Sequence, residues 1–346
     1  ARIKQLVAKA AKLEMPAIAM TDHGNAHGAY EFWNQATQHG IKPIIGIEAY
    51  LAPGSRREKS KVRWGSGGDD DVSGGGAYSH MTMWATDNAS MQNLFRLSSE
   101  SYLSGYYFKP RMDRELLHKY GKGLIATTGC PGGEVQTRIR LGQYKEAVET
   151  AAEFRDIFGE GNFFVEIMDH SLDIEKRVRE DLLRLAKDLG LPLVATNDLH
   201  YTEPEDATAH DALLCVQVGS NLYDENRFKF ESQEYYLKSA AEMREIFKEF
   251  PDACDNTLLI AERCNVEFEQ REKELMTRFD VPAGETEDSW FEKEVFAGLD
   301  RRFGGKVPED RLTQARYEIG VIHKMGYSGY FRGVADFINW SRRQGI

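Results

Sequence analysis

The chain has 346 residues, of which 41% are hydrophobic and 29% are charged, and its formal net charge is −11. This length suits one large domain and a smaller one, and the apolar stretches are far shorter than the ~18 residues that a membrane span requires. The negative charge argues against a general binder of polyanions, so any contact with nucleic acid must be local or must come from parts of the protein outside this sequence. Four cysteines without close pairing argue against a disulfide framework and favour a reduced, cytoplasmic protein.

The first 200 or so residues repeat a short apolar run, a polar turn and an amphipathic stretch, which is the alternation expected of βα units. Strands are predicted at residues 17–21, 43–50, 81–85, 123–128, 162–168 and 191–196. Helices are predicted at residues 29–39, 143–158 and 172–189. This order predicts an α/β fold with a parallel, barrel-like sheet.

Residues 53–77 interrupt this alternation and predict a long, mobile surface loop. Its basic residues are Arg56, Arg57, Lys59, Lys61 and Arg63. Two interpretations stay open for this segment, a solvated insertion and an arm that contacts DNA phosphates.

The strand signal fades after about residue 206, and helices are predicted at residues 289–303 and 309–324. A charged run at residues 269–273, followed by a Val-Pro-Ala-Gly sequence, has the composition of a linker. We therefore expect one domain over residues 1–268 and a second segment over residues 269–346.

Side chains that bind metal ions follow nearly every predicted strand. They are Asp22 and His23, Glu48, Cys130, Asp169 and His170, and Asp198 and His200. The carboxyl ends of parallel strands open onto one face of a βα barrel, so we expect these side chains to converge. Each alone is compatible with a turn, a helix cap or a buried small side chain. Together, imidazole, carboxylate and thiolate groups predict a site for zinc or a related divalent ion.

Clustered divalent ions suit the hydrolysis of phosphoesters, because two ions about 3.5 to 4 Å apart clamp the phosphate and activate a bound water. A carboxylate such as Glu48 can bridge two ions. Asp198 and His200 are two residues apart, and on an extended segment their side chains would point the same way and reach one metal.

Several motifs resemble those of one known family. They are Thr21-Asp22-His23-Gly24-Asn25, Gly46-Ile47-Glu48-Ala49-Tyr50, His80 ahead of an apolar strand, Thr128-Gly129-Cys130-Pro131 and Thr196-Asn197-Asp198-Leu199-His200-Tyr201. In order and spacing they resemble the PHP (polymerase and histidinol phosphatase) domain of bacterial DNA polymerase III alpha subunits, the replicative C-family DNA polymerases. Residues 326–338 resemble the opening of the palm of these polymerases, so the resemblance covers essentially the whole chain.

The resemblance implies a distorted, seven-stranded βα (TIM-like) barrel of PHP type, followed by a mainly helical α/β segment. It implies up to three divalent metal ions, Zn²⁺ first, with Mn²⁺ or Mg²⁺ as alternatives. By motif match the ligands are His23, Glu48, His80, Cys130, Asp198 and His200, and the catalytic residues among them are Glu48, Asp198 and His200. Only the resemblance places His80 in the site, because His80 precedes its strand.

The activity implied for this segment is a 3′ to 5′ exonuclease that proofreads during DNA replication, within a DNA-directed DNA polymerase (a nucleotidyltransferase). We expect a first strand with a His-x-His motif before Ala1, and the palm's catalytic aspartates, which use Mg²⁺, beyond Ile346. The expected partner is primer–template DNA. Regions outside the segment would contact the sliding clamp and other replisome subunits, and no membrane partner is expected.

Two alternatives stay open. The PHP domain could be a catalytically inactive platform that binds metal for stability and docks a separate proofreading subunit. It could also be a phosphatase of a small phosphomonoester, but that interpretation leaves residues 326–346 without a role.

Overall fold

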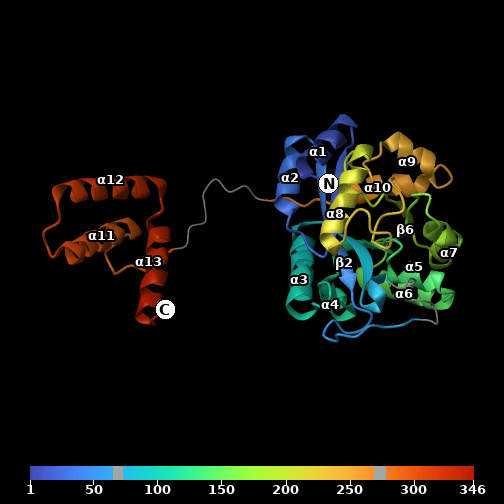
Figure 1. The fold of residues 1–346 in the computed structure, drawn as a ribbon, viewed down its shortest axis with the longest axis horizontal. Helices are drawn as coiled ribbons and strands as arrows, with labels where there is room; N and C mark the ends of the chain where they lie inside the picture. Colours follow the sequence, from blue (N-terminus) through green and yellow to red (C-terminus); the bar gives the residue numbers. More distant parts are fainter. Residues whose placement is uncertain (65–72, 269–277) are drawn as a thin grey trace. The chain divides into compact units, whose positions relative to one another are not determined.

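The computed structural model describes residues 1–64, 73–268 and 278–346. The chain divides into two compact units, Ala1–Phe268 and Glu269–Ile346, both drawn in Figure 1. The charged run at residues 269–273, where the linker was predicted to begin, lies outside the described residues.

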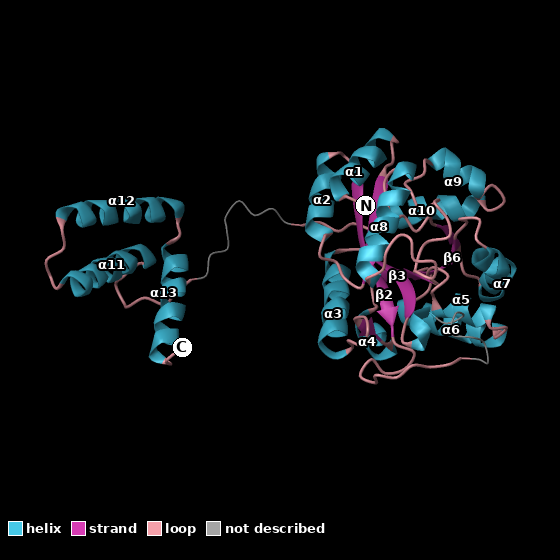
Figure 2. Ribbon diagram, in the orientation of Figure 1, coloured by secondary structure: helices cyan, strands magenta, loops and turns pink. Residues whose placement is uncertain are grey.

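The first unit is built on one curled, seven-stranded sheet, coloured magenta in Figure 2. Its strands are β1 (Ala17–His23), β2 (Lys42–Leu51), β3 (Ser79–Ala85), β4 (Arg111–Met112), β5 (Leu124–Thr127), β6 (Phe163–Ile167) and β7 (Leu193–Ala195). The strand order is β1-β2-β3-β5-β6-β7, and the short β4 pairs with β2. The resemblance implies a distorted, seven-stranded barrel of PHP type, and the structure has the seven strands in a mixed α/β sheet curled into a half-barrel.

The prediction of an all-parallel sheet is wrong at β3. The pairs β1–β2, β5–β6 and β6–β7 are parallel, but β3 runs antiparallel to both β2 and β5. The beginning of β3 therefore lies at the edge where the parallel strands end, and His80 is paired in register with Tyr50 near the end of β2. The same edge of the sheet thus collects residues that follow parallel strands and residues that start β3.

Helices cover the sheet in the first unit. They are α1 (Ile3–Lys12), α2 (Ala29–Gln38), α3 (Asn88–Ser104), α4 (Arg114–Tyr120), α5 (Glu134–Arg140), α6 (Tyr144–Phe158), α7 (Asp173–Leu189), α8 (Ala207–Val218), α9 (Ala240–Ile246) and α10 (Pro251–Arg263), with short 3-10 turns at Ser73–Gly76 and Pro204–Asp206. In α7, the buried residues Val178, Leu182 and Leu185 recur at helical spacing and pack into the main core. Asp87 caps α3, because its carboxylate accepts a hydrogen bond from the Ser90 amide at 2.8 Å.

The basic segment after β2 is packed against the domain in its described part. Arg56 is only 3% exposed, and its guanidinium forms an ion pair with Asp113 at 3.0 Å. The buried Arg111 holds the same segment, since its guanidinium donates to the carbonyl oxygens of Arg56 at 3.1 Å and Glu58 at 2.8 Å. The prediction of a mobile loop is therefore wrong for these residues.

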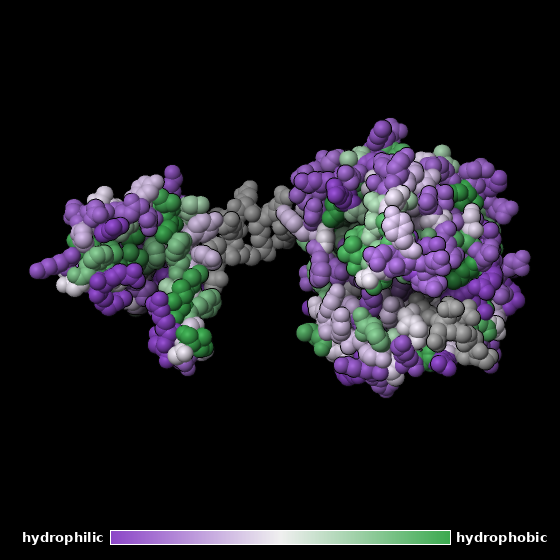
Figure 3. All heavy atoms as spheres, viewed as in Figure 1, coloured by the Kyte–Doolittle hydropathy of each residue, from purple (hydrophilic) through white to green (hydrophobic). Residues whose placement is uncertain are grey.

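The described residues of the second unit are helical, without a strand, so the expected α/β character is not found there. The helices are α11 (Glu287–Phe303), α12 (Glu309–Met325) and α13 (Ser328–Arg343), and the first two overlap the predicted helices. Helix α13 leaves large apolar side chains exposed, among them Phe337 and Trp340, and green apolar surface lies along it in Figure 3. Across the described parts of both units, no helix combines the length and the apolar character needed to cross a membrane.

Candidate metal centre

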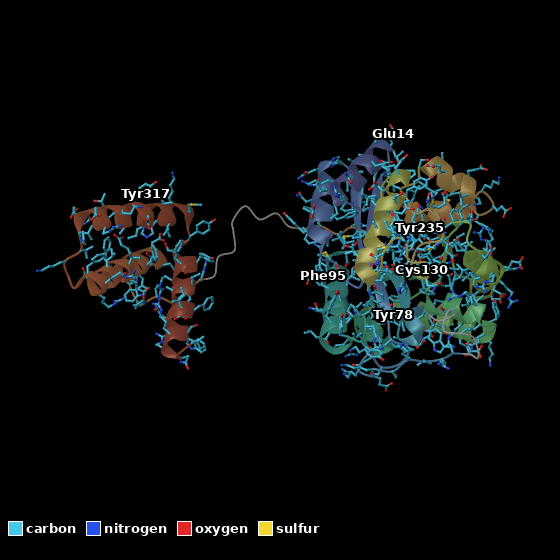
Figure 4. The ribbon with its side chains drawn as sticks, viewed as in Figure 1. Glu14, Tyr78, Phe95, Cys130, Tyr235 and Tyr317 are labelled. Atoms are coloured by element: carbon cyan, nitrogen blue, oxygen red, sulfur yellow. The ribbon has the colours of Figure 1, made fainter. Side chains whose placement is uncertain are left out.

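Three predicted ligands meet at one edge of the sheet. Glu48, His80 and Cys130 each offer one donor atom, and these atoms lie within 4.8 Å of one another. The Glu48 Oε1 atom is 2.9 Å from His80 Nδ1, and the Cys130 Sγ atom is 3.3 Å from the same nitrogen and 3.4 Å from Glu48 Oε1. Cys130 lies in the interior of the first unit, where Figure 4 labels it. This is the closest grouping of metal-binding side chains among the described residues.

The local backbone explains how these side chains meet. Glu48 lies near the end of β2, His80 is the second residue of the antiparallel β3, and Cys130 follows β5 by three residues. Gly129 has φ +79°, and a Cβ atom at this position would lie 2.8 Å from the His80 carbonyl oxygen. Only glycine brings the Cys130 loop this close to β3 without strain.

Charge and burial set the protonation of this cluster in the metal-free protein. Burial alone would raise the pKa of Glu48, but the neighbouring His80 and His23 outweigh it and lower this pKa to about 2. Burial would lower the pKa of His80, but the Glu48 carboxylate raises it. Burial, and then the Glu48 charge, raise the pKa of the Cys130 thiol well above its ordinary value. The cluster therefore holds an ionised carboxylate beside two groups that must lose protons before they bind a metal.

His23 connects this cluster to the solvent side of the site. Its Nδ1 atom lies 3.2 Å from Glu48 Oε2, and its ring centroid lies 5.7 Å from that of His80 and 6.0 Å from that of His200. Burial lowers the pKa of His23, which favours the neutral imidazole that ligates metals. Its side chain is 46% exposed, so this edge of the cluster is accessible.

Asp198 and His200 lie close together but not in the conformation that the sequence predicts. They follow β7 in a loop, and Asp198 has φ +42°, so the assumption of an extended segment is wrong. The His200 Nδ1 atom is still only 3.9 Å from Asp198 Oδ1, and it lies 2.7 Å from the Asp198 carbonyl oxygen. A proton on Nδ1 donated to that carbonyl leaves the Nε2 lone pair of neutral His200 free for a metal.

One cavity joins these residues. His23, Glu48, Asp198 and His200 line a cavity of about 700 Å³. Burial, and then the Glu48 carboxylate, raise the pKa of Asp198. Carboxylates placed this way repel each other unless a cation lies between them, so the donor set fits a divalent metal.

Asp169 and His170, which also follow a strand, are not part of the site. His170 Nδ1 lies 2.5 Å from Glu175 Oε1 and its Nε2 lies 2.9 Å from the Asn197 carbonyl oxygen, so both ring nitrogens have protein partners. The Asp169 carboxylate forms an ion pair with Arg179 at 2.8 Å. Both residues stabilise the loop after β6.

Comparison with known proteins shows the family to which the chain belongs. Residues 1–170 match the family described as the PHP domain, and residues 289–346 match the family described as the bacterial DNA polymerase III alpha NTPase domain. The chain is 52% identical over 357 residues to the DNA polymerase III subunit alpha of Saccharopolyspora erythraea, and 51% identical over 351 residues to that of Mycobacterium tuberculosis strain H37Rv. The chain belongs to the DNA polymerase III alpha family. A relative from Thermus aquaticus is 37% identical over 391 residues, 96% of this chain.

This chain spans about 30% of the length of these DNA polymerase III alpha relatives. The alignments with the Saccharopolyspora and Mycobacterium proteins cover 100% of this chain and 30% of each relative, and the Thermus alignment covers 31% of its relative. The family membership therefore holds for this segment, and residues 289–346 of the second unit match the NTPase domain of the family.

The PHP domain contains a further buried carboxylate that the motifs do not indicate. Glu166, in β6, is 2% exposed and accepts hydrogen bonds from the Thr127 hydroxyl and, at 2.6 Å, from the Thr196 hydroxyl. Burial raises the pKa of Glu166 to about 7, and the Asp198 and Glu48 charges add to this. The signal in the sequence is a single acidic residue inside the apolar run 163–167. Glu166 links the ends of β5 and β7, from which the loops that carry the ligands depart.

The predicted DNA-binding arm is only partly available. Arg56 is buried in its ion pair with Asp113, so the prediction that Arg56 contacts DNA is wrong. Arg57 is exposed but pairs with Glu115 at 2.9 Å. The exposed residues Lys59, Lys61 and Arg63 stay candidates for a contact with phosphates.

Proposed function

We propose that the first unit is a metal-dependent 3′ to 5′ exonuclease acting within a DNA polymerase III alpha subunit. The observation that carries the proposal is the meeting of Glu48, His80 and Cys130 within 4.8 Å, with His23 and His200 beside them. A histidine, thiolate and carboxylate set suits hydrolytic metal ions, and Glu48 of this set also lines the 700 Å³ cavity.

The proposed ligands are the six residues His23, Glu48, His80, Cys130, Asp198 and His200. Zn²⁺ is the preferred ion because thiolate and imidazole groups favour it, with Mn²⁺ or Mg²⁺ at positions richer in oxygen. Bound divalent ions would supply an activated water and stabilise the leaving oxygen. The low pKa of Glu48 keeps its carboxylate ionised at neutral pH, so this side chain would be available to hold a divalent ion.

A strand before Ala1 is part of the same proposal. The strands β1 and β7 end the sheet order, and the 700 Å³ cavity is lined by residues of both, such as Met20 and Ala195. The open strand edges and the cavity support a further strand between them, where a His-x-His pair would complete the ligand set.

The whole protein is proposed to be a DNA-directed DNA polymerase that binds primer–template DNA. Its Mg²⁺-dependent polymerase centre, and its contacts with a sliding clamp and other replisome subunits, would lie in regions outside this segment. The similarity to DNA polymerase III alpha subunits supports this proposal.

A second candidate function is an inactive platform that binds metal for stability and docks a separate proofreading subunit. The burial of Glu48 and Cys130, at 6% and 9% exposed, favours it, because structural metal sites are closed to substrate. The partly exposed His23 and the cavity it shares with His200 favour the exonuclease.

The test uses the full-length polymerase with Asp198→Asn or His200→Ala, and His118→Ala as the control, since His118 is exposed on α4 away from the cluster. We expect both site variants to lose 3′-end degradation and to keep primer extension, with the control unchanged. An exonuclease rate within about threefold of wild type, under ~0.7 kcal/mol in barrier, would refute the assigned site. Bound metal without any degradation by wild type would favour the platform.

A further inference from the structure

The loop between α3 and β4 presents aromatic side chains to solvent. Tyr106 is 54% exposed and Phe108 is 59% exposed, and Tyr102 at the end of α3 is 41% exposed. The Tyr102 and Tyr106 ring centroids lie 6.4 Å apart at an interplanar angle of 31°. Large aromatic side chains gathered on a surface mark a site of contact with a ligand or partner.

The backbone of this loop is strained at the exposed Phe108. Phe108 has φ +61°, a left-handed conformation that bulky residues rarely adopt. Its neighbours hold it there, because the Tyr107 amide donates to the Lys109 carbonyl oxygen at 3.1 Å and the Tyr107 ring packs 5.0 Å from the Arg111 guanidinium. Strain maintained by surrounding contacts is concentrated at functional sites.

The exposed rings share a cavity with two of the candidate metal ligands. Tyr102, Tyr106 and Phe108 line a cavity of about 420 Å³ together with His23 and His200. The cavity is also lined by residues of α8 and the segment that follows it, including His210, Leu213 and Phe230. A chain bound in this cavity would therefore contact both the rings and two of the candidate ligands.

Positive charge lies beside the rings although the whole chain is acidic. The Lys61 Nζ atom lies 5.2 Å from the Phe108 ring centroid, and the Lys109 Nζ atom lies 5.7 Å from the Tyr50 ring centroid. Ammonium groups next to exposed aromatic rings suit a ligand with alternating phosphates and flat bases.

We propose that Tyr102, Tyr106 and Phe108 form a stacking platform for the unpaired bases at an end of single-stranded DNA. The bases rest on the rings, Lys61 and Lys109 face the phosphates, and the terminal phosphodiester reaches His23 and His200. Bases inside a duplex are already stacked on each other, so the platform selects frayed or mismatched ends. This inference rests on the proposed function for the chemistry at the terminus, but not for the binding itself.

The experiment measures binding of a fluorescein-labelled oligothymidylate of about 12 nucleotides to the full chain by fluorescence anisotropy, with EDTA present so that no strand is cut. Loss of one stacked base should weaken binding about fivefold or more in Phe108→Ala and in Tyr106→Ala. Phe108→Trp should retain wild-type binding. Tyr317→Ala is the matched control, because Tyr317 is 68% exposed on α12 in the second unit.

The outcomes separate the platform from the exonuclease. Weakened binding in both alanine variants, with the control unchanged, supports the platform. If wild type degrades no DNA, only the proposed exonuclease is overturned, and the binding result still supports the platform. Binding that is undetectable in wild type, or equal in wild type and both variants, overturns the platform. Competition by a blunt duplex as effective as that by the single strand also overturns it. Phe108 and Tyr106 are both exposed, so circular dichroism should show folded variants.

Discussion

Replacing Glu166 by glutamine should stabilise the PHP domain, and the difference in free energy of unfolding between the variant and wild type should grow as the pH rises. Burial raises the pKa of Glu166 to about 7, whereas the unfolded chain has the ordinary value of 4.5. Below about pH 4.5 both states carry the proton, and the shifted pKa costs no stability. Above about pH 7 both states are ionised, and the buried charge costs its full free energy.

The size of this effect follows from the shift. At 1.36 kcal/mol for each pKa unit, a change from 4.5 to about 7 corresponds to about 3 kcal/mol. Glu166 is 2% exposed, so water screens little of this penalty. The amide of Glu166→Gln has no charge to bury and can still accept a hydrogen bond from Thr127 or Thr196. The variant should therefore gain about 3 kcal/mol relative to wild type between about pH 4.5 and pH 7.5.

Urea denaturation at a series of pH values, with chelator present, measures the difference. Chelation matters because a bound cation would favour the Glu166 carboxylate and reduce its pKa. A difference between Glu166→Gln and wild type that grows with pH supports the assignment. A difference that is constant across the series would show that Glu166 titrates normally, and the proposed burial of its charge would be wrong.

Three further predictions concern the metal and the packing around it. A strong chelator should lower the melting temperature of the chain, because the ions bind only the folded state, and identical melting curves would contradict a filled site. Affinity for Zn²⁺ should rise with pH, since binding displaces protons from Cys130 and His80. Calorimetric titrations that give equal affinities at about pH 6 and about pH 8 would contradict this. Arg111→Met should destabilise the PHP domain by about 3 kcal/mol or more, because the buried carbonyl oxygens of Gly105, Ala77 and Arg56 lose their donor. A loss below ~1 kcal/mol in denaturant unfolding would show that water replaces the guanidinium.

Much of the site could be predicted because parallel strands end at a common edge. Glu48 and Cys130 lie where that rule places them, and Asp198 and His200 follow the last strand. This rule does not predict His80, because an apolar run does not reveal the direction of its strand. Only the antiparallel pairing of β3 with β2 shows that the beginning of β3 lies at the same edge.

Other residues could not be assigned because their partners are distant in the chain. His170 has the same position after a strand as the ligands, but the Asn197 carbonyl oxygen, 27 residues away, binds its second nitrogen. The sequence predicts that Arg56 is an exposed cation, but its guanidinium is buried and donates a hydrogen bond to the carboxylate of Asp113, 57 residues further along the chain. Local sequence carries no information about either contact.

The most direct test of the metal centre is the metal content of full-length polymerase, purified without added metal or chelator and compared with His80→Ala and Cys130→Ala. Inductively coupled plasma mass spectrometry should find at least one tightly bound divalent ion in wild type and fewer in each variant. In a parallel nuclease assay, only wild type should release a mismatched primer end. A wild-type protein without bound divalent metal, or variants that keep the wild-type content, would contradict the assignment of Glu48, His80 and Cys130 as ligands.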